Sequence, residues 1–132
     1  MANNWDARIK LLRPVDAGTP FTADTVIRGK TFDVLASVEV GKGIHQFTTE
    51  YTISVSVVNL SKSTQVGQIS DNKKLPPDET EYNDELRLNF PAGWNAKADV
   101  GDVLQAVASY TVLAGSQTDY STATSQLFLV VS

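Results

Sequence analysis

The feature that most constrains this chain is a strict alternation of apolar and small polar side chains. It is clearest in residues 51–58, which read Tyr-Thr-Ile-Ser-Val-Ser-Val-Val. A β-strand points successive side chains to opposite faces of its sheet, so this alternation predicts a strand with one buried and one solvated face. The pattern recurs along most of the chain and therefore favours an all-β fold.

Alternation and turn residues together predict about seven strands. The three clearest segments are residues 31–40, 47–60 and 102–113, and weaker strands are expected at 6–12, 64–70, 86–90 and 120–131. The expected core-facing residues of the clearest segments are Phe32, Val34, Ala36, Val38, Val40, Tyr51, Ile53, Val55, Val57, Leu104, Ala106, Ala108, Tyr110 and Val112.

Three segments depart from this simple pattern. Val58 and Leu60 break the alternation of their strand, which predicts a bulge or a strand that crosses a sheet edge. Residues 13–25 contain Pro14, Gly18 and Pro20 and are expected to form a connection. Asp78 followed by Glu81 resembles a helix capping box, so a single helical turn is expected over residues 78–84.

Two short fragments resemble parts of bacterial immunoglobulin-like modules. Ile27-Arg28-Gly29-Lys30-Thr31-Phe32-Asp33-Val34 is similar to the start of their second strand, and Ala98-Asp99-Val100-Gly101-Asp102-Val103 to the turn before their sixth. The resemblance implies an architecture, since the inter-sheet cysteines of antibody domains are absent and no tryptophan lies at the third-strand position. We expect one antiparallel, immunoglobulin-like β-sandwich domain over residues 1–132. A jelly roll is the alternative, because pattern alone does not fix strand order.

Composition excludes several classes of function. The chain has no cysteine, so it has no disulfides and no thiolate metal ligands. Its first residues lack the basic start and apolar core of a signal peptide, and no apolar run approaches the ~20 residues of a membrane helix. We therefore expect no membrane insertion and a cytoplasmic location, unless a leader has been removed. No basic stripe is present, which argues against nucleic acid as a partner.

The net charge of −4 comes entirely from the segment between Asp71 and Glu85, which contains six acidic residues and two lysines. The segment is expected to be a solvated loop. A calcium site is the alternative, with Asp78, Glu79, Glu81 and Asp84 as ligands, although the spacing of an EF-hand is missing. The only histidine, His45, is expected to be a solvated loop residue, and it has too few companions for zinc or for a catalytic triad. We expect no cofactor and no enzymatic activity.

Aromatic residues suggest a glycan as one possible ligand. Trp94 follows Pro91-Ala92-Gly93 in an expected loop, where it can project as a platform for a sugar ring, with Tyr82 as a second aromatic. The competing interpretation is that Trp94 caps one end of the core.

The end of the chain carries the most localised functional signal. Leu127-Phe128-Leu129-Val130-Val131 is an unbroken apolar run, which a strand shows when both of its faces are covered. One cover is the connection at 13–25 with Val15, Phe21 and the adjoining Val26, another is a second subunit, and a ligand groove is the third interpretation. Val103, Val107 and Leu35 also fall on nominally solvated faces.

Exposed apolar patches of this kind mark interfaces. The leading hypothesis is therefore an interaction or structural module that binds itself or another protein through a sheet face. The expected interface residues are Leu127, Leu129, Val131, Val103 and Val107.

Overall fold

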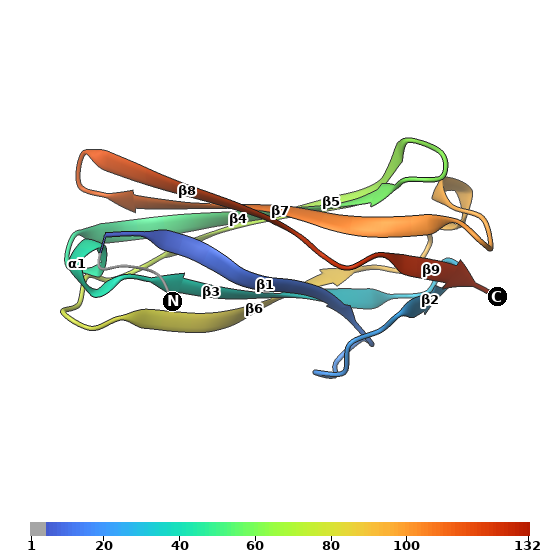
Figure 1. The fold of residues 1–132 in the computed structure, drawn as a ribbon, viewed down its shortest axis with the longest axis horizontal. Coiled ribbons are helices and arrows are strands. Elements are labelled where there is room, and N and C mark those ends of the chain that lie inside the picture. The colour runs from blue at the N-terminus through green and yellow to red at the C-terminus, as the bar shows by residue number, and fades with distance from the viewer. Residues whose placement is uncertain (1–4) are drawn as a thin grey trace.

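The structure is a computed structural model that describes residues 5–132. Within these residues the chain forms nine strands, one short α-helix and one turn of 3-10 helix (Figure 1). The strands are β1 (Ala7–Val15), β2 (Thr25–Ile27), β3 (Phe32–Val40), β4 (Thr48–Asn59), β5 (Thr64–Lys74), β6 (Tyr82–Phe90), β7 (Val103–Ala114), β8 (Gln117–Thr124) and β9 (Phe128–Val131). The helices are α1 (Lys42–His45) and η1 (Asn95–Lys97).

The strands make two sheets that pack face to face. One sheet has the order β1-β3-β6, and the other has the order β2-β9-β7-β4-β5, with β8 also paired to β7. All pairs are antiparallel except β2 with β9, which is parallel. The predicted all-β, immunoglobulin-like sandwich is confirmed.

The strand count exceeds the expected seven for two local reasons. The segment expected as one strand over residues 120–131 is interrupted at residues 125–127, so β8 and β9 both lie along the same edge of β7. The segment 13–25, expected as a connection, contributes the end of β1 and the first residue of β2.

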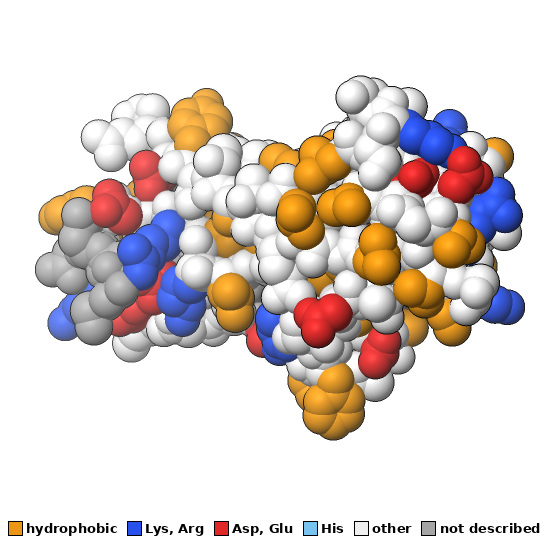
Figure 2. All heavy atoms as spheres, turned by 45° about the vertical axis from the view of Figure 1, so that its right-hand side comes forward, with side chains coloured by type: hydrophobic (Ala, Val, Ile, Leu, Met, Phe, Trp, Pro, Cys, Tyr) orange, Lys and Arg blue, Asp and Glu red, His pale blue; other side chains and the backbone are white. Residues whose placement is uncertain are grey.

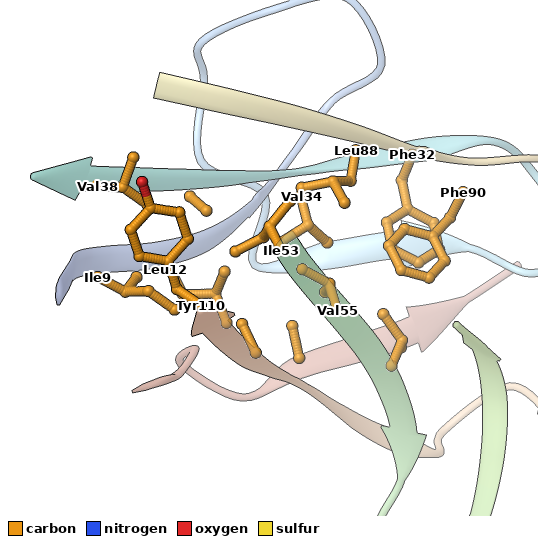
Figure 3. Close-up of a cluster of buried hydrophobic side chains, with 14 of the residues drawn as sticks. Ile9, Leu12, Phe32, Val34, Val38, Ile53, Val55, Leu88, Phe90 and Tyr110 are labelled. Carbon is orange, nitrogen blue, oxygen red and sulfur yellow. The ribbon is translucent and has the colours of Figure 1, made fainter. Parts of the chain in front are cut away.

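The core lies between the two sheets and is built from the alternating positions of their strands. All the core-facing residues expected for β3, β4 and β7 are buried there, as predicted. Phe32 stacks on Phe90 with ring centroids 5.3 Å apart, and β6 contributes Leu88 beside it (Figure 3). Alternation therefore identified the inward side of each central strand correctly.

The break expected in β4 lies in its partner strand. Alternation continues through β4, with Val58 half-buried on the outer side and Asn59 fully buried. Val57 pairs with Gly67 and Val58 with Gln65, so Val66 of β5 is the extra residue of a bulge. The predicted bulge therefore occurs at this point of the pairing, but its extra residue lies in β5. The alternation of β4 looked broken because Asn59 is a polar side chain in an inward position.

The helical turn expected over residues 78–84 is wrong. The chain is irregular up to Glu81, and β6 begins at Tyr82, where pairing with Val40 of β3 uses the backbone groups that a helix would need. The short helix lies instead at α1. His45 there accepts a backbone hydrogen bond from Asp78 at 3.1 Å, which holds the acidic loop in place.

The segment between β1 and β2 is hydrogen-bonded to part of the outer face of the three-stranded sheet, around Asp33. Asp33 accepts hydrogen bonds from the backbone of Gly18 at 2.9 Å and from Arg87 at 2.6 Å, and Arg87 also bonds to the Thr19 carbonyl at 2.8 Å. Leu35 pairs with Arg87 in the register and is only 1% exposed. Leu35, a residue expected on a solvated face, is therefore buried.

Candidate interaction face

An exposed apolar surface lies on the outer side of the six-stranded sheet, around β9. Phe128 and Val130 point into the core, whereas Leu127 is 55% exposed and Leu129 is 40% exposed. The unbroken apolar run therefore continues the strand alternation, and its second set of side chains faces outward. We define the apolar face as Ile27, Val103, Val107, Leu127, Leu129 and Val131.

The register shows why these residues form one surface. Leu129 pairs with Val103 of β7 on one side and with Thr25 of β2 on the other, and Val131 pairs with Ile27. Paired residues in neighbouring strands put their side chains on the same face of a sheet. Figure 2 shows hydrophobic side chains spread over the half of the molecule that carries this end of the sheet.

The covers expected from residues 13–25 do not shield this face. Val26 is buried, but β2 pairs with the edge of β9 and leaves its outer side open. Phe21 is 69% exposed, and Val15 is fully buried at the end of β1. Within residues 5–132, no segment buries Leu127 or Leu129.

Sequence reasoning missed one member of this face, Ile27, and two of its neighbours, Leu60 and Val100. Ile27, Leu60 and Val100 are all about half exposed. Leu60 donates its backbone N–H to the Val103 carbonyl at 2.8 Å, and Gly101 donates to Val130 at 2.8 Å, which places both loops at the same end of the sheet. Their position depends on chain pairings that no local pattern reveals.

The aromatic residues expected for a glycan site lie far apart. Trp94 is only 6% exposed, donates its indole N–H to the Lys30 carbonyl at 2.8 Å, and packs edge-on against Phe32. Tyr82 lies at the other end of β6, where its hydroxyl donates to Asp84 at 2.7 Å. At ~3.3 Å per residue, the length of β6 separates the two ends by roughly 30 Å. Trp94 caps the core rather than projecting from it.

A different pair of aromatic rings is exposed. Trp5 and Phe47 lie nearly parallel, with an interplanar angle of 13° and ring centroids 6.4 Å apart. They border a hollow of about 310 Å³ beside α1 and the β7–β8 turn. Sequence reasoning did not find this pair, because the two residues come from separate parts of the chain and only the fold brings them together.

The carboxylates considered for calcium do not gather. Asp78, Glu79 and Glu81 are exposed in the loop before β6, and Asp84 lies on β6 bonded to Tyr82. No group of three or more acidic or histidine side chains within residues 5–132 has the geometry to hold a metal ion.

His45 is buried rather than solvated, which corrects the expectation from sequence. Its ring nitrogen Nδ1 donates to the Thr80 carbonyl at 2.6 Å, and its ring lies edge-on to Tyr82. A histidine bonded to a backbone carbonyl in this way fastens a loop. Its hydrogen bonds therefore give it a structural role in holding residues 75–81 against α1.

Two buried carboxylates are structural as well. Burial alone would raise the pKa of Asp33, but hydrogen bonds from Gly18, Asn89 and Arg87 outweigh it and hold that pKa below its usual value. Asp102 accepts from the Asp99 backbone N–H and from Asn59, and these bonds lower its pKa. Both groups are therefore ionised at neutral pH and fix loops to the sandwich.

The comparisons with known proteins add a likeness of fold. No family model matches the sequence, and no curated protein matches it either. Thirteen chains of solved structures are similar. One is a crystal structure from Bacteroides fragilis, provisionally described as a β-galactosidase, with a TM-score of 0.47 and 14% identity. The match covers 94% of the present chain and 17% of that protein. No helix within residues 5–132 is long and apolar enough to cross a membrane.

Proposed function

We propose that this protein is a non-enzymatic interaction module that associates with a second copy of itself through the apolar face. The observation that carries the proposal is the outward exposure of Leu129 on the paired strand β9 and of Leu127 immediately before it. Burying such side chains between two molecules gains roughly 25 cal/mol for each Å² of apolar surface removed from water.

A second copy suits this face better than an unrelated partner. The six residues that define the face are all apolar, so the surface has no charge pattern that would demand an opposite pattern on the partner. In a two-fold dimer the same patch meets itself, and an apolar sheet face is complementary to a copy of itself. The two sheets would then pack as the two layers of a sandwich do.

The test is the oligomeric state at high micromolar concentration, measured by size-exclusion chromatography with light scattering. We expect a dimer for the wild-type protein and a monomer for Leu129→Lys, because the substitution buries a charge in the centre of the interface. Thr118→Lys is the matched control. It adds the same charge to an exposed position of β8, at the other end of the sheet, and should leave the dimer intact.

A monomeric wild-type protein that is unchanged by Leu129→Lys would overturn the proposal. A stable complex with a different protein that is lost with Leu129→Lys, while the isolated chain stays monomeric, would replace the second copy with that partner.

Carbohydrate binding is the second candidate, supported by the Trp5–Phe47 pair. The apolar faces of sugar rings pack against exposed aromatic rings, and the adjoining turn offers backbone groups from Gly115 and Ser116 for hydrogen bonds. We expect quenching or a blue shift of tryptophan emission when a panel of soluble glycans is added, and no response from Trp5→Ala. The control is Phe21→Ala, which removes an exposed aromatic residue elsewhere. If the wild-type protein shows no response to any glycan of the panel, carbohydrate binding is excluded as its function.

A further inference from the structure

The two sides of the sandwich differ: side-chain hydrogen bonds bridge the sheets on one side, and the sheets, as far as the structure describes the chain, end in unpaired strand edges on the other. On one side, Asp119 and Ser121 of β8 accept hydrogen bonds from the backbone N–H groups of Ala7 and Ile9 in β1, at 2.6 Å and 3.1 Å. On the other side, β5 and β6 each end their sheet. Among residues 5–132, no strand pairs with their outer edges. Unpaired edges are the sites at which a sheet can accept another strand.

A pocket of about 300 Å³ lies between these two edges, beside the first half of β5. The buried rings of Phe90 and Trp94 line it from the three-stranded sheet and the following loop. Val66 and Ile69 line it from β5. Its size is at the lower end of the range for ligand sites and suits a single apolar side chain.

Two features of β5 keep the pocket open. Val66 is the extra residue of the bulge, which alters the course of the edge strand at this point. Gly67 follows it, and a Cβ atom there would lie 3.3 Å from Cδ2 of Phe90. A larger residue would therefore fill the space above the Phe90 ring.

Charge is distributed unevenly along this open edge. The half of β5 next to the pocket, residues 64–70, carries no charged side chain, whereas the other half contains Asp71, Lys73 and Lys74. Charged side chains on an edge strand discourage pairing. The uncharged half is therefore the part of the edge that can accept a strand.

Lys97 supplies a single positive charge at the rim of the pocket. Its side chain is exposed, and it forms no ion pair with any carboxylate within residues 5–132. The neighbouring Asp99 is paired with Arg28 and Lys62 instead. A ligand with an apolar group for the pocket and a carboxylate for Lys97 would complement this rim.

We propose that the edge of β5 at residues 64–70 binds an extended peptide of a partner protein by strand addition. The peptide places one aromatic or branched aliphatic side chain in the Phe90–Trp94 pocket, and an acidic residue close to it in the peptide pairs with Lys97. This site lies at the opposite edge of the sheet from β2 and β9, so it is separate from the apolar face.

The test is selection of a displayed library of random nine-residue peptides against the whole protein. We expect the selected peptides to share an apolar residue with an acidic residue one or two positions away. When they bind, backbone amide signals of residues 64–70 and the indole N–H signal of Trp94 should shift in NMR spectra. Gly67→Leu should weaken binding roughly tenfold or more by filling the pocket.

Lys97→Glu tests the charge without touching the core. Selection against this variant should enrich basic residues in place of acidic ones, whereas Lys42→Glu, an exposed lysine on α1, should leave the preference unchanged. The proposal is wrong if no peptide is enriched, if Lys97→Glu selects the same sequences as the wild type, or if the shifted signals lie outside β5 and the pocket. The Lys97→Glu result decides the matter even if Gly67→Leu does not fold.

Discussion

Asp33, Asn59 and Tyr110 are polar residues in covered positions of the sandwich. Asn59 occupies an inward position of β4 and donates to Asp102 at 2.8 Å, across 43 residues of sequence. Asp33 is satisfied by the loop after β1 and by β6. Tyr110 differs, because its hydroxyl is buried without a partner among the described residues. Burial also raises its pKa, so the hydroxyl keeps its proton.

Removing the hydroxyl of Tyr110 should stabilise the protein. A buried polar group without a partner has lost its hydrogen bonds to water and gained none, at a cost of about 1–3 kcal/mol. We expect Tyr110→Phe to raise the free energy of unfolding by about 1 kcal/mol in urea denaturation. Tyr120→Phe, at an exposed position, should have no effect. A loss of stability in Tyr110→Phe would mean that the hydroxyl has a partner.

Asp33 should make stability depend on pH in the acid range. Because its folded pKa is lowered, its contribution is fully present above the unfolded pKa of about 4 and is lost as the pH falls through the folded value. We expect Asp33→Asn to reduce the free energy of unfolding by about 1–3 kcal/mol at pH 7.

The comparison at pH 3 and pH 7 separates this effect from packing. At pH 3, below the unfolded pKa of about 4, the unfolded chain binds a proton at this carboxyl, so wild type loses part of this contribution and its difference from Asp33→Asn should shrink. The control is Asp16→Asn, an exposed residue of the loop after β1, which should change stability little at either pH. An equal loss from Asp33→Asn at both pH values would contradict the prediction.

Among the elements, the long central strands could be predicted from the sequence, whereas the places where the outer strands begin and end could not. Alternation predicted the inward residues of β3, β4 and β7, because each of these strands has one core face along its whole length. It did not predict the interruption between β8 and β9, or the start of β6, because those depend on pairing with β7 and β3. Leu35 and Leu129 looked alike in sequence. In the fold, Leu35 is buried and Leu129 is 40% exposed.

On the β1–β8 side of the sandwich, side chains of β8 accept hydrogen bonds from backbone N–H groups of β1, in place of a paired strand. Asp119→Ala removes the acceptor of the Ala7 N–H group, so we expect a loss of about 1–2 kcal/mol in the free energy of unfolding. Amide exchange at Ala7 should become faster in the same variant. Thr122→Ala, an exposed residue of β8, is the control and should change neither measurement. Unchanged exchange at Ala7 would show that this hydrogen bond does not protect the strand.

At the scale of the whole molecule, the outer faces of the two sheets differ in how far the chain itself covers them. The outer face of the three-stranded sheet is partly covered by the chain itself, around Asp33, where Arg87 and the loop after β1 are hydrogen-bonded. The outer face of the six-stranded sheet is left open at its β9 end. The candidate interaction face was predicted in part from sequence, through Leu127, Leu129, Val131, Val103 and Val107, since an apolar run at a strand needs some cover. Ile27 required knowledge of the β2–β9 pairing.

Self-association through that face should make thermal stability depend on protein concentration. A dimer interface binds only folded chains, so a higher concentration favours the folded state and raises Tm. We expect Tm to rise between low and high micromolar concentration for the wild-type protein and to stay constant for Leu129→Lys. A constant Tm for both proteins would contradict the prediction.

The strands run along the long axis of the molecule, with the start of β1 beside α1 at one end and the end of β9 at the other (Figure 1). Tension applied between these two points would pull β1 along β3, and β9 along β2 and β7. Hydrogen bonds between strands lie across the strand direction. Such a pull would load the bonds of each pair together rather than open them one after another. The arrangement gives the fold a direction in which it resists being stretched.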